Sequence, residues 1–444
     1  MPRLFGTDGI RGVANVDLKP TLAYALGRAT AHRLVGAGGA LVVGQDTRRS
    51  GDLFVAAITA GATSLGTTVH RVGVVPTPAL AFLAGEGEFA AGIMVSASHN
   101  PADDNGLKVL DADGLKLDDA IEDELEQLIW RSEELGGVGN AELGIAVDAA
   151  TLVRRYLDHR LALARRVDAG GLRVVLDCAN GSGCELGPQI LAATGASLEV
   201  IHAEPDGVNI NVRSGATDPA ALAQAVVAHG ADVGFALDGD ADRLIAVDAR
   251  GAVVDGDQVL GILALERLRR GALSGGGLVV SVLSNGGLQA AVEAAGGTVI
   301  RTPVGDKYIL DGMQVSGAVL GGEKSGHVIV REHTTSGDGI VTALEVLRVM
   351  TAAGATLAEL AAAIPLLPQQ QRAIKARHKD QWEGDPALQR AIADAQARLG
   401  STGRVLVRPS GTEPALRVMV EGPDAGVVAE LADALAALAD QRLN

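Results

Sequence analysis

The sequence is poor in cysteine, in aromatic residues and in long apolar runs. Cys178 and Cys184 are the 2 cysteines among 444 residues, too few for a disulfide framework or a four-cysteine zinc site. We therefore expect both thiols to be reduced and to contribute to packing. Aromatic residues make up 2% of the chain and glycine occurs 58 times. This composition predicts cores of Ala, Val, Leu and Ile joined by many glycine-dependent loops.

No stretch approaches the roughly 18–20 uninterrupted apolar residues that a membrane-spanning helix requires. The nearest candidate, residues 341–367, is interrupted by Glu345, Arg348 and Glu359. The first residues of the sequence also lack the apolar core of a secretory signal peptide. These absences predict a cytoplasmic protein without a membrane partner.

Basic residues are outnumbered, with 38 Lys and Arg against 54 Asp and Glu and a formal charge of −16. This balance argues against a nucleic-acid partner, because phosphate backbones are bound mainly by clustered Lys and Arg. A small phosphorylated ligand is still compatible with it, since such a ligand needs only a few local cations. Hydrophobic residues at 47% and charged residues at 21% indicate a folded globular protein. Because single cores stop growing at roughly 250–300 residues, the chain should divide into several domains.

One order of elements recurs three times along the chain. A short apolar strand is followed by a polar or glycine-rich loop, a small-residue helix, a glycine and a second short strand, in residues 41–72, 173–201 and 278–300. Short apolar runs alternating with helical patterns that end at glycine indicate β-loop-α-β units. Recurrence at intervals above about a hundred residues predicts three related α/β domains rather than a short-period solenoid. A shared small-residue composition is the alternative explanation of the repeat.

The C-terminal part has a different pattern and predicts a small α+β module. Its expected elements are a strand at 372–377, a helix from Asp385-Pro386 to Leu399, strands at 403–408 and 415–421, and a last helix to about Leu443. The periodic patterns break near residues 145, 250 and 368. We therefore expect four domains, 1–145, 146–250, 251–367 and 368–444.

A metal site is predicted by three aspartates that follow an apolar run at alternate positions, Asp238, Asp240 and Asp242. Two carboxylates about 4 Å apart repel by roughly 4 kcal/mol at an effective dielectric constant near 20, so a cation should lie among them. Oxygen ligands select Mg²⁺ or Ca²⁺ rather than zinc. An EF-hand is excluded, because its sixth and twelfth positions are Arg243 and Ala249 here. The alternative is an acidic, solvated turn.

A second loop, residues 92–101, is an apolar run that ends in serines and a proline turn. Ser98 and His99 do not form a hydrolase pair, because adjacent side chains diverge and no G-x-S-x-G elbow is present. Taken alone, Ser98 is more often a turn residue than a nucleophile. Lys108 follows within ten residues of Ser98. It is a candidate proton shuttle or phosphate contact, with a plain surface lysine as the alternative.

The third loop places Glu323 and Ser325 on alternate positions between glycines. A carboxylate and a hydroxyl in this arrangement suit the binding of sugar hydroxyls. A polar turn with a tolerated glutamate explains the same residues.

The fourth loop, residues 408–414, combines Arg408, Ser410 and Thr412 with a tight turn. Backbone N–H groups of such a turn, one cation and two hydroxyls fit a phosphate. We favour phosphate binding over an ordinary hairpin turn, because the surrounding chain is acidic.

Together these loops resemble the α-D-phosphohexomutase superfamily over essentially the full chain. Five motifs occur in the family's order: FGTDGIRG at 5–12, SASHNP at 96–101, DGDADR at 238–243, GEKSGH at 322–327 and RPSGTEP at 408–414. The resemblance implies three homologous α/β domains with mixed sheets, plus a smaller C-terminal α+β domain, around a central cleft.

The resemblance also implies a role for each loop. Ser98 is then the serine that carries a phosphoryl group, and Asp238, Asp240 and Asp242 hold one Mg²⁺ ion together with a phosphoserine oxygen of Ser98. The implied catalytic residues are Ser98, Lys108, Arg243, Arg11 and His99. The implied substrate-binding residues are Glu323, Ser325, Arg408, Ser410, Gly411 and Thr412.

The implied reaction interconverts glucosamine 6-phosphate and glucosamine 1-phosphate through a 1,6-bisphosphate, and would supply UDP-N-acetylglucosamine and cell-wall synthesis. A hexose 1,6-bisphosphate is the implied activator and a homodimer the implied assembly. Gly411 and residues 304–308 are similar to the amino-sugar branch. Lys324, where Gln is expected, and Ala102-Asp103 depart from the family pattern. The alternatives are a mutase of neutral hexose phosphates and a non-catalytic sugar-phosphate sensor.

Overall fold

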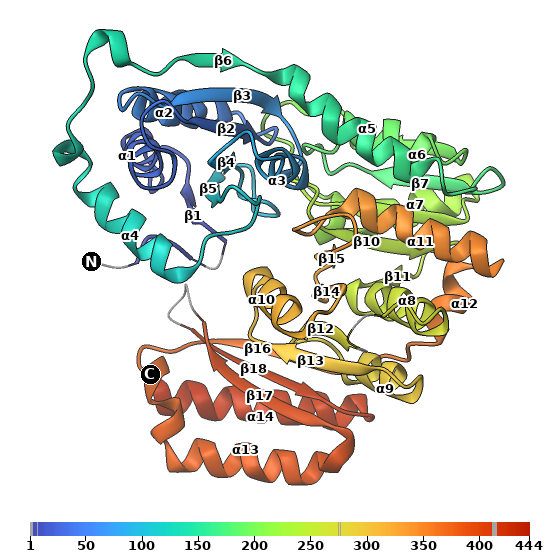
Figure 1. Cartoon of the computed structure of the whole chain (residues 1–444). Helices are drawn as coiled ribbons and strands as arrows, with labels where there is room; N and C mark the ends of the chain where they lie inside the picture. Colours follow the sequence, from blue (N-terminus) through green and yellow to red (C-terminus); the bar gives the residue numbers. More distant parts are fainter. Residues whose placement is uncertain (1–2, 7, 274, 276, 411–414) are drawn as a thin grey trace. The chain divides into compact units, whose positions relative to one another are not determined.

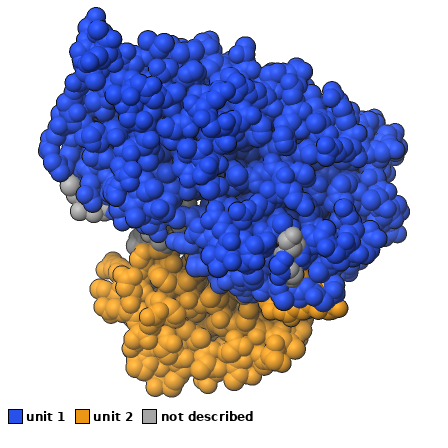
Figure 2. Space-filling model, in the orientation of Figure 1, with its two compact units in different colours: residues 1–283, 295–363 blue, residues 284–294, 364–444 orange. Residues whose placement is uncertain are grey.

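The computed structural model describes residues 3–6, 8–273, 275, 277–410 and 415–444 of the chain. The chain divides into two compact units, residues 1–283 with 295–363 and residues 284–294 with 364–444 (Figure 2). Of the sheets that the described residues form, three lie in the larger unit and one in the smaller (Figure 1).

The first sheet of the larger unit is mixed, in the order β1-β5-β4-β2-β3-β6. Its strands are β1 (Ile10–Val13), β2 (Ala40–Gln45), β3 (Thr68–Val74), β4 (Ala91–Val95), β5 (Asp104–Leu110) and β6 (Ala146–Asp148). Its helices are α1 (Pro20–Thr30), α2 (Gly51–Thr63), α3 (Thr77–Ala84) and α4 (Asp119–Trp130). The pairs β2–β3, β2–β4 and β3–β6 are parallel, whereas β5 pairs antiparallel with β4 and β1. Every residue of β4 is buried, as expected of a strand covered on both faces.

The second sheet has the order β11-β10-β9-β7-β8 and the third the order β13-β12-β14-β15. The larger unit thus has three α/β parts, each built around one of these sheets. The second part consists of α5 (Val153–Ala164), β7 (Arg173–Asp177), α6 (Leu186–Ala192), β8 (Ser197–Ile201), α7 (Ala220–His229), β9 (Val233–Leu237), β10 (Leu244–Asp248) and β11 (Val253–Val254). The third part consists of α8 (Gly256–Arg269), β12 (Gly277–Ser281), β13 (Thr298–Thr302), α10 (Asp306–Ser316), β14 (Leu320–Gly322), β15 (Val328–Val330), α11 (Gly339–Ala353) and α12 (Leu357–Ala362). Both sheets combine parallel and antiparallel pairs.

The smaller unit contains the elements expected of the C-terminal α+β module, together with one helix of the third repeated segment. It contains α9 (Gly286–Ala294), β16 (Gln369–Lys375), α13 (Pro386–Leu399), β17 (Arg404–Pro409), β18 (Ala415–Glu421) and α14 (Ala425–Leu443), and its strands form an antiparallel sheet in the order β16-β18-β17. Asp385 caps α13 by accepting hydrogen bonds from two backbone N–H groups, as the sequence predicted. The strand expected at 372–377 is Gln369–Lys375 in the structure, so both predicted ends were wrong. It begins earlier because the polar residues from Gln369 also pair with β18, and its pairing with β18 ends at Lys375.

The threefold repeat is confirmed. The predicted strand–helix–strand segments are β2-α2-β3, β7-α6-β8 and β12-α9-β13, and the two strands of each copy pair in parallel. A parallel pair requires a crossover connection, which the helix supplies. The fold class is therefore three α/β parts with mixed sheets followed by a smaller α+β part. Among the described residues, no helix is both long and apolar enough to cross a membrane, and both cysteines are free thiols.

A buried ion pair joins the second and third parts of the larger unit. Asp338, the N-cap of α11, accepts hydrogen bonds from Arg160 Nε at 3.1 Å and Tyr156 Oη at 3.0 Å. Its other carboxylate oxygen accepts from Val341 N at 2.9 Å. Arg160 and Asp338 are both 0% exposed, so each charge depends on the other for compensation.

We predict that Asp338→Ala lowers the free energy of unfolding by about 3–5 kcal/mol, because it leaves the Arg160 guanidinium buried without its counter-ion. Urea unfolding followed by circular dichroism measures the loss. Asp158→Ala is the matched control, since it removes an exposed carboxylate that pairs with Arg154 at 2.8 Å. The control should lose less than about 1 kcal/mol. Equal losses in the two variants would contradict the stabilising role of the buried pair.

Candidate functional site

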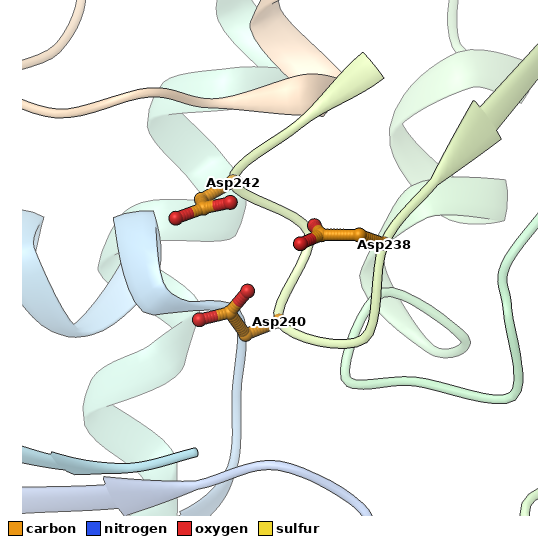
Figure 3. A group of neighbouring side chains, drawn as sticks. All are labelled: Asp238, Asp240 and Asp242. Atoms are coloured by element: carbon orange, nitrogen blue, oxygen red, sulfur yellow. The ribbon is translucent and has the colours of Figure 1, made fainter. Parts of the chain in front are cut away.

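The three aspartates lie in the six-residue loop that joins β9 to β10. The two strands pair up to Leu237 and Leu244, so the loop must reverse direction between them. One carboxylate oxygen from each of Asp238, Asp240 and Asp242 lies within 4.8 Å of the others (Figure 3). All three residues are at most 4% exposed, which excludes the solvated acidic turn.

The curvature of this loop is fixed by backbone contacts from three segments. Gly239 O accepts from Ser182 N at 2.8 Å, Ala241 O accepts from Gly339 N at 3.0 Å, and Asp240 O accepts from Thr77 N at 2.9 Å. These donors come from the β7–α6 loop, from the start of α11 and from the start of α3. Each α/β part of the larger unit therefore holds one carbonyl of the loop.

The carboxylates have oxygens that a cation could bind. Asp240 Oδ1 and Asp242 Oδ1 are buried, and no described residue donates a hydrogen bond to either. Burial, with the charges of Asp242 and Asp240, raises the pKa of Asp238 well above its usual value. Burial also opposes ionisation of Asp242, but His327 and Lys108 outweigh it and hold the pKa of Asp242 far below its usual value. An all-oxygen donor set of this kind fits a hard divalent cation.

Lys108, on β5, lies against the same carboxylates. Its Nζ is 2.8 Å from Asp240 Oδ2, 3.1 Å from Asp8 Oδ2 and 4.0 Å from Asp242 Oδ2. Burial alone would lower the pKa of Lys108, but Asp240 and Asp8 outweigh it and raise that pKa. The lysine is 2% exposed, so it is a buried, protonated ammonium group and not a surface lysine.

Ser98 is held beside the aspartates in a strained conformation. Its Oγ donates a hydrogen bond to Asp238 Oδ2 at 2.7 Å, and the residue is 0% exposed. Its φ of 52° lies in the left-handed region, which non-glycine residues rarely adopt. The carbonyl of Ser98 accepts from Arg48 Nη2 at 3.0 Å and from Asn211 Nδ2 at 2.9 Å. These two side chains hold the backbone that presents the hydroxyl.

Buried hydrogen bonds of Ser96 and Asp46 hold the serine loop in place. Ser96 Oγ accepts from Ser98 N at 2.9 Å and donates to Asp46 Oδ2 at 2.6 Å. Asp46 also accepts from Arg48 N at 2.9 Å and forms an ion pair with the Arg48 guanidinium at 3.3 Å. Burial raises the pKa of Asp46 to about 6. The polar loop after the first predicted strand therefore positions Ser98.

Arg11 and Arg243 both face this region. Arg11 Nη1 donates to Asn100 Oδ1 at 3.0 Å, which ties β1 to the serine loop. Arg243 Nε is 3.9 Å from Asp238 Oδ2 and 3.8 Å from Asp242 Oδ1. The Arg243 guanidinium could therefore offset negative charge at the carboxylate cluster, whereas the Arg11 guanidinium pairs with Asp8.

His99 lies close to the serine hydroxyl. Its Nδ1 is 3.3 Å from Ser98 Oγ, so the expectation that these two adjacent side chains diverge was wrong. Burial, with the charges of Arg243 and Arg11, lowers the pKa of His99 to about 4. The imidazole is therefore neutral near pH 7.

The third predicted loop, between β14 and β15, reaches the metal loop. Leu244 N donates to Gly326 O at 3.0 Å, and Arg243 and His327 form an isolated β-bridge. Glu323 Oε1 accepts from Gly305 N at 3.1 Å, and the buried Ser325 Oγ has no hydrogen-bond partner among the described residues. The structure thus brings Glu323 and Ser325 beside the aspartate loop.

The fourth predicted loop belongs to the smaller unit. Arg408 is on β17, and the buried Ser410 follows it, with Ser410 N donating to Ala415 O at 2.8 Å. Lys379 Nζ donates to Ser410 O at 2.6 Å. Gly411 and Thr412 lie outside the described residues.

Sequence reasoning missed several residues that support the site. Asp8 pairs with Lys108, Lys116 and Arg11, although it lies within a motif that the sequence analysis identified. Thr77 Oγ1 donates to Asp240 Oδ2 at 2.6 Å. No local pattern marks Thr77 or Lys116, because their partners are distant in the sequence.

Family models match the chain in four consecutive segments. Models described as phosphoglucomutase/phosphomannomutase alpha/beta/alpha domains I, II and III match residues 2–136, 154–251 and 255–366. The model of the C-terminal domain of the same family matches residues 373–438.

Curated relatives match over nearly the full chain. The phosphoglucosamine mutase of Moorella thermoacetica is 51% identical over 427 residues, covering 96% of each chain. That of Carboxydothermus hydrogenoformans is 45% identical and covers 99% of this chain and 100% of its own. That of Mycobacterium marinum is 47% identical, with 98% of each chain covered.

Solved structures share the fold. A phosphoglucomutase/phosphomannomutase family protein from Burkholderia thailandensis superimposes with a TM-score of 0.83 at 24% identity, covering 100% of this chain and 98% of its own. The N-acetylphosphoglucosamine mutase of Aspergillus fumigatus in complex with GlcNAc-6P and magnesium gives a TM-score of 0.71 at 20% identity, with 99% and 96% covered.

Gly181 provides a test of the metal loop. A Cβ at Gly181 would lie 2.4 Å from Gly239 O, so we predict that Gly181→Ala displaces the loop and weakens divalent-cation binding about tenfold. Titration with Mn²⁺ followed by electron paramagnetic resonance measures the dissociation constant. Gly171→Ala is the control, since its Cβ would meet no atom within 4 Å. Unchanged Mn²⁺ affinity in a folded Gly181→Ala variant would show that the loop does not form the cation site.

Proposed function

The chain belongs to the phosphoglucomutase/phosphomannomutase family, and on that premise we propose how its residues interconvert glucosamine 6-phosphate and glucosamine 1-phosphate. The enzyme is an isomerase of the phosphoglucosamine mutase type, since relatives with that name are 45–51% identical over nearly the full chain. One observation carries the mechanism: Ser98 Oγ lies 2.7 Å from a carboxylate of the buried aspartate cluster.

Ser98 is the proposed carrier of the phosphoryl group. Phosphoserine 98 transfers its phosphoryl group to the free hydroxyl of the sugar monophosphate, which breaks the Oγ–P bond and forms a 1,6-bisphosphate. The intermediate then reorients, and its other phosphate returns to Ser98 Oγ and releases the isomeric monophosphate. The strained backbone at Ser98 supports this role, because strain of this kind is found at functional sites.

Asp238, Asp240 and Asp242, with a phosphoserine oxygen, are the proposed holders of Mg²⁺, which neutralises charge on the transferring phosphoryl group when bound. The buried oxygens of Asp240 and Asp242 that accept no hydrogen bond from described residues support this assignment. Arg243 and Arg11 are proposed to offset the remaining charge on the phosphoryl oxygens.

Proton transfer is assigned to Lys108. It holds a proton at Nζ between Asp240 and Asp8, and it is buried away from solvent. In this environment it can give its proton to Ser98 Oγ as the Oγ–P bond breaks, and it then takes up the proton that the attacking sugar hydroxyl releases. His99 is proposed to orient the Ser98 hydroxyl, since its neutral ring can accept or donate a hydrogen bond there.

Substrate binding is assigned to the two remaining loops. Glu323 and Ser325 are proposed to hold the sugar hydroxyls, which the unpartnered Ser325 Oγ supports. The proposed ligands of the phosphate that does not react are Arg408, Ser410, Gly411 and Thr412. One such phosphate site serves both directions, because the two ends of the substrate exchange roles.

The remaining proposals follow from the family resemblance. A hexose 1,6-bisphosphate activates the enzyme by phosphorylating Ser98. The chain is divided into domains near residues 145, 250 and 368, and acts as a cytoplasmic homodimer.

We predict that Ser98→Ala abolishes turnover of glucosamine 6-phosphate, with kcat falling at least about a thousandfold, because no phosphoenzyme can form. The assay contains Mg²⁺ and glucose 1,6-bisphosphate and measures glucosamine 1-phosphate. Ser132→Ala, a buried serine outside the site, should retain wild-type kcat. Full activity of Ser98→Ala would favour the non-catalytic reading of this serine and overturn the mechanism.

We predict that kcat/KM for glucosamine 6-phosphate exceeds that for glucose 6-phosphate and mannose 6-phosphate by at least about tenfold. Glu323 would supply a carboxylate near the sugar, and a carboxylate favours an ammonium group over a neutral hydroxyl. The same assay on the three sugar phosphates measures the ratios. A preference for a neutral hexose would keep the phosphoserine mechanism and change the substrate.

A further inference from the structure

In the larger unit, α11 packs against both α5 and α8 (Figure 1). A hollow lies beside these three helices. Its volume is about 260 Å³, and its lining comes from the ends of α5 and α8, from the segment after β15 and from α11. None of the residues assigned above to catalysis, metal or substrate lines this hollow.

Its lining is cationic in an acidic chain. Four arginines line it, Arg166, Arg267, Arg270 and Arg348, against two carboxylates, Glu332 and Glu345. Glu266, which does not line the hollow, pairs with Arg270 at 3.1 Å and with Arg348 at 3.0 Å, so four positive and three negative charges leave a surplus of one, although the whole chain carries −16. A local excess of guanidinium groups attracts anions, and phosphate above all, because the planar fork of Arg matches its oxygens.

Several of these guanidinium donors are not used. Arg166 is exposed, and its side chain has no hydrogen bond or ion pair among the described residues. Arg270 uses Nη1 for Glu266 at 3.1 Å. Arg267 is 3% exposed, and its buried Nη1 has no hydrogen-bond partner among the described residues. A buried donor left without a partner is destabilising, and a hydrogen bond to a ligand oxygen would remove this penalty.

The Glu332 carboxylate can be displaced from Arg267 by a ligand. Arg267 Nη2 pairs with Glu332 at 3.1 Å and with Glu345 at 3.0 Å. The Glu332 side chain is 46% exposed, whereas that of Glu345 is 9% exposed. An incoming anion could therefore displace Glu332 into solvent while Glu345 keeps its place.

Apart from His333, the rest of the lining is apolar and comes from Leu163, Ala272, Val341 and Leu344. The volume equals that of about nine water molecules, far more than an inorganic phosphate fills. The hollow therefore suits an anion that also carries an apolar ring face.

We propose that this hollow binds an organic phosphate of the nucleotide class, with the phosphates on Arg166, Arg267 and Arg270 and the ring against the α11 leucine and valine. The site is separate from the one that isomerises the sugar phosphate. Calorimetric titration of the full chain with ADP tests it, in the absence of Mg²⁺ and with glucose 1,6-bisphosphate present throughout. We expect one ADP per chain, with adenosine and inorganic phosphate binding at least about tenfold more weakly.

The variant Arg166→Gln/Arg270→Gln should weaken ADP binding at least about tenfold and leave mutase activity unchanged. Arg165→Gln/Arg269→Gln is the matched control, since both arginines are exposed sequence neighbours that do not line the hollow. The control should bind ADP within about twofold of wild type. Glu332→Gln should bind ADP more tightly, because it removes a competing carboxylate.

Three results would overturn the proposal. These are no ADP binding at millimolar concentration, equal weakening in the two double variants, and phosphate binding as tight as that of ADP. Melting temperatures close to that of the wild type verify that each variant is folded. Glu332→Gln tests the site independently of folding, because unfolding cannot increase the affinity for ADP.

Discussion

Three carboxylates buried on one short loop repel one another, and the candidate site is organised around that repulsion. Asp238, Asp240 and Asp242 lie too close together for all to be ionised without cations nearby. The protein surrounds them with Lys108 and Arg243. The neighbours perturb the aspartates unequally, so that the pKa of Asp238 is raised while that of Asp242 is lowered. A bound divalent cation would compensate the remaining charge, and Ser98, the proposed carrier of the phosphoryl group, lies beside Asp238.

Holding such a loop requires contacts from outside it. An isolated hairpin would move its carboxylates apart, because nothing local favours their convergence. Here Thr77, Ser182 and Gly339 donate backbone hydrogen bonds to successive carbonyls of the loop. They come from the first, second and third α/β parts, so the cluster forms only when all three parts are packed into one unit. The buried pair of Arg160 and Asp338 strengthens the same packing at the start of α11.

The serine loop is also held by contacts from outside it. Ser98 adopts a positive φ that its own side chain disfavours, and hydrogen bonds to its backbone offset this strain. Arg48 and Asn211 bind its carbonyl, while Ser96 binds its N–H group. Since Asn211 belongs to the second part and Arg48 to the first, the geometry of the hydroxyl depends on the contact between the two. The aspartate cluster and the Ser98 conformation therefore both form only when the α/β parts pack together.

The repeated α/β units, the C-terminal α+β module and the residue types of the aspartate and serine loops could all be predicted from the sequence. These features depend on short-range periodicity, on glycine positions and on motifs, which are local. Three features depend on the tertiary structure: Asp8 contacts Lys108 and Thr77 contacts Asp240, Lys108 is buried, and β16 begins at Gln369. The physical reason is that burial, charge compensation and strand register depend on partners far away in the chain, which no local pattern records.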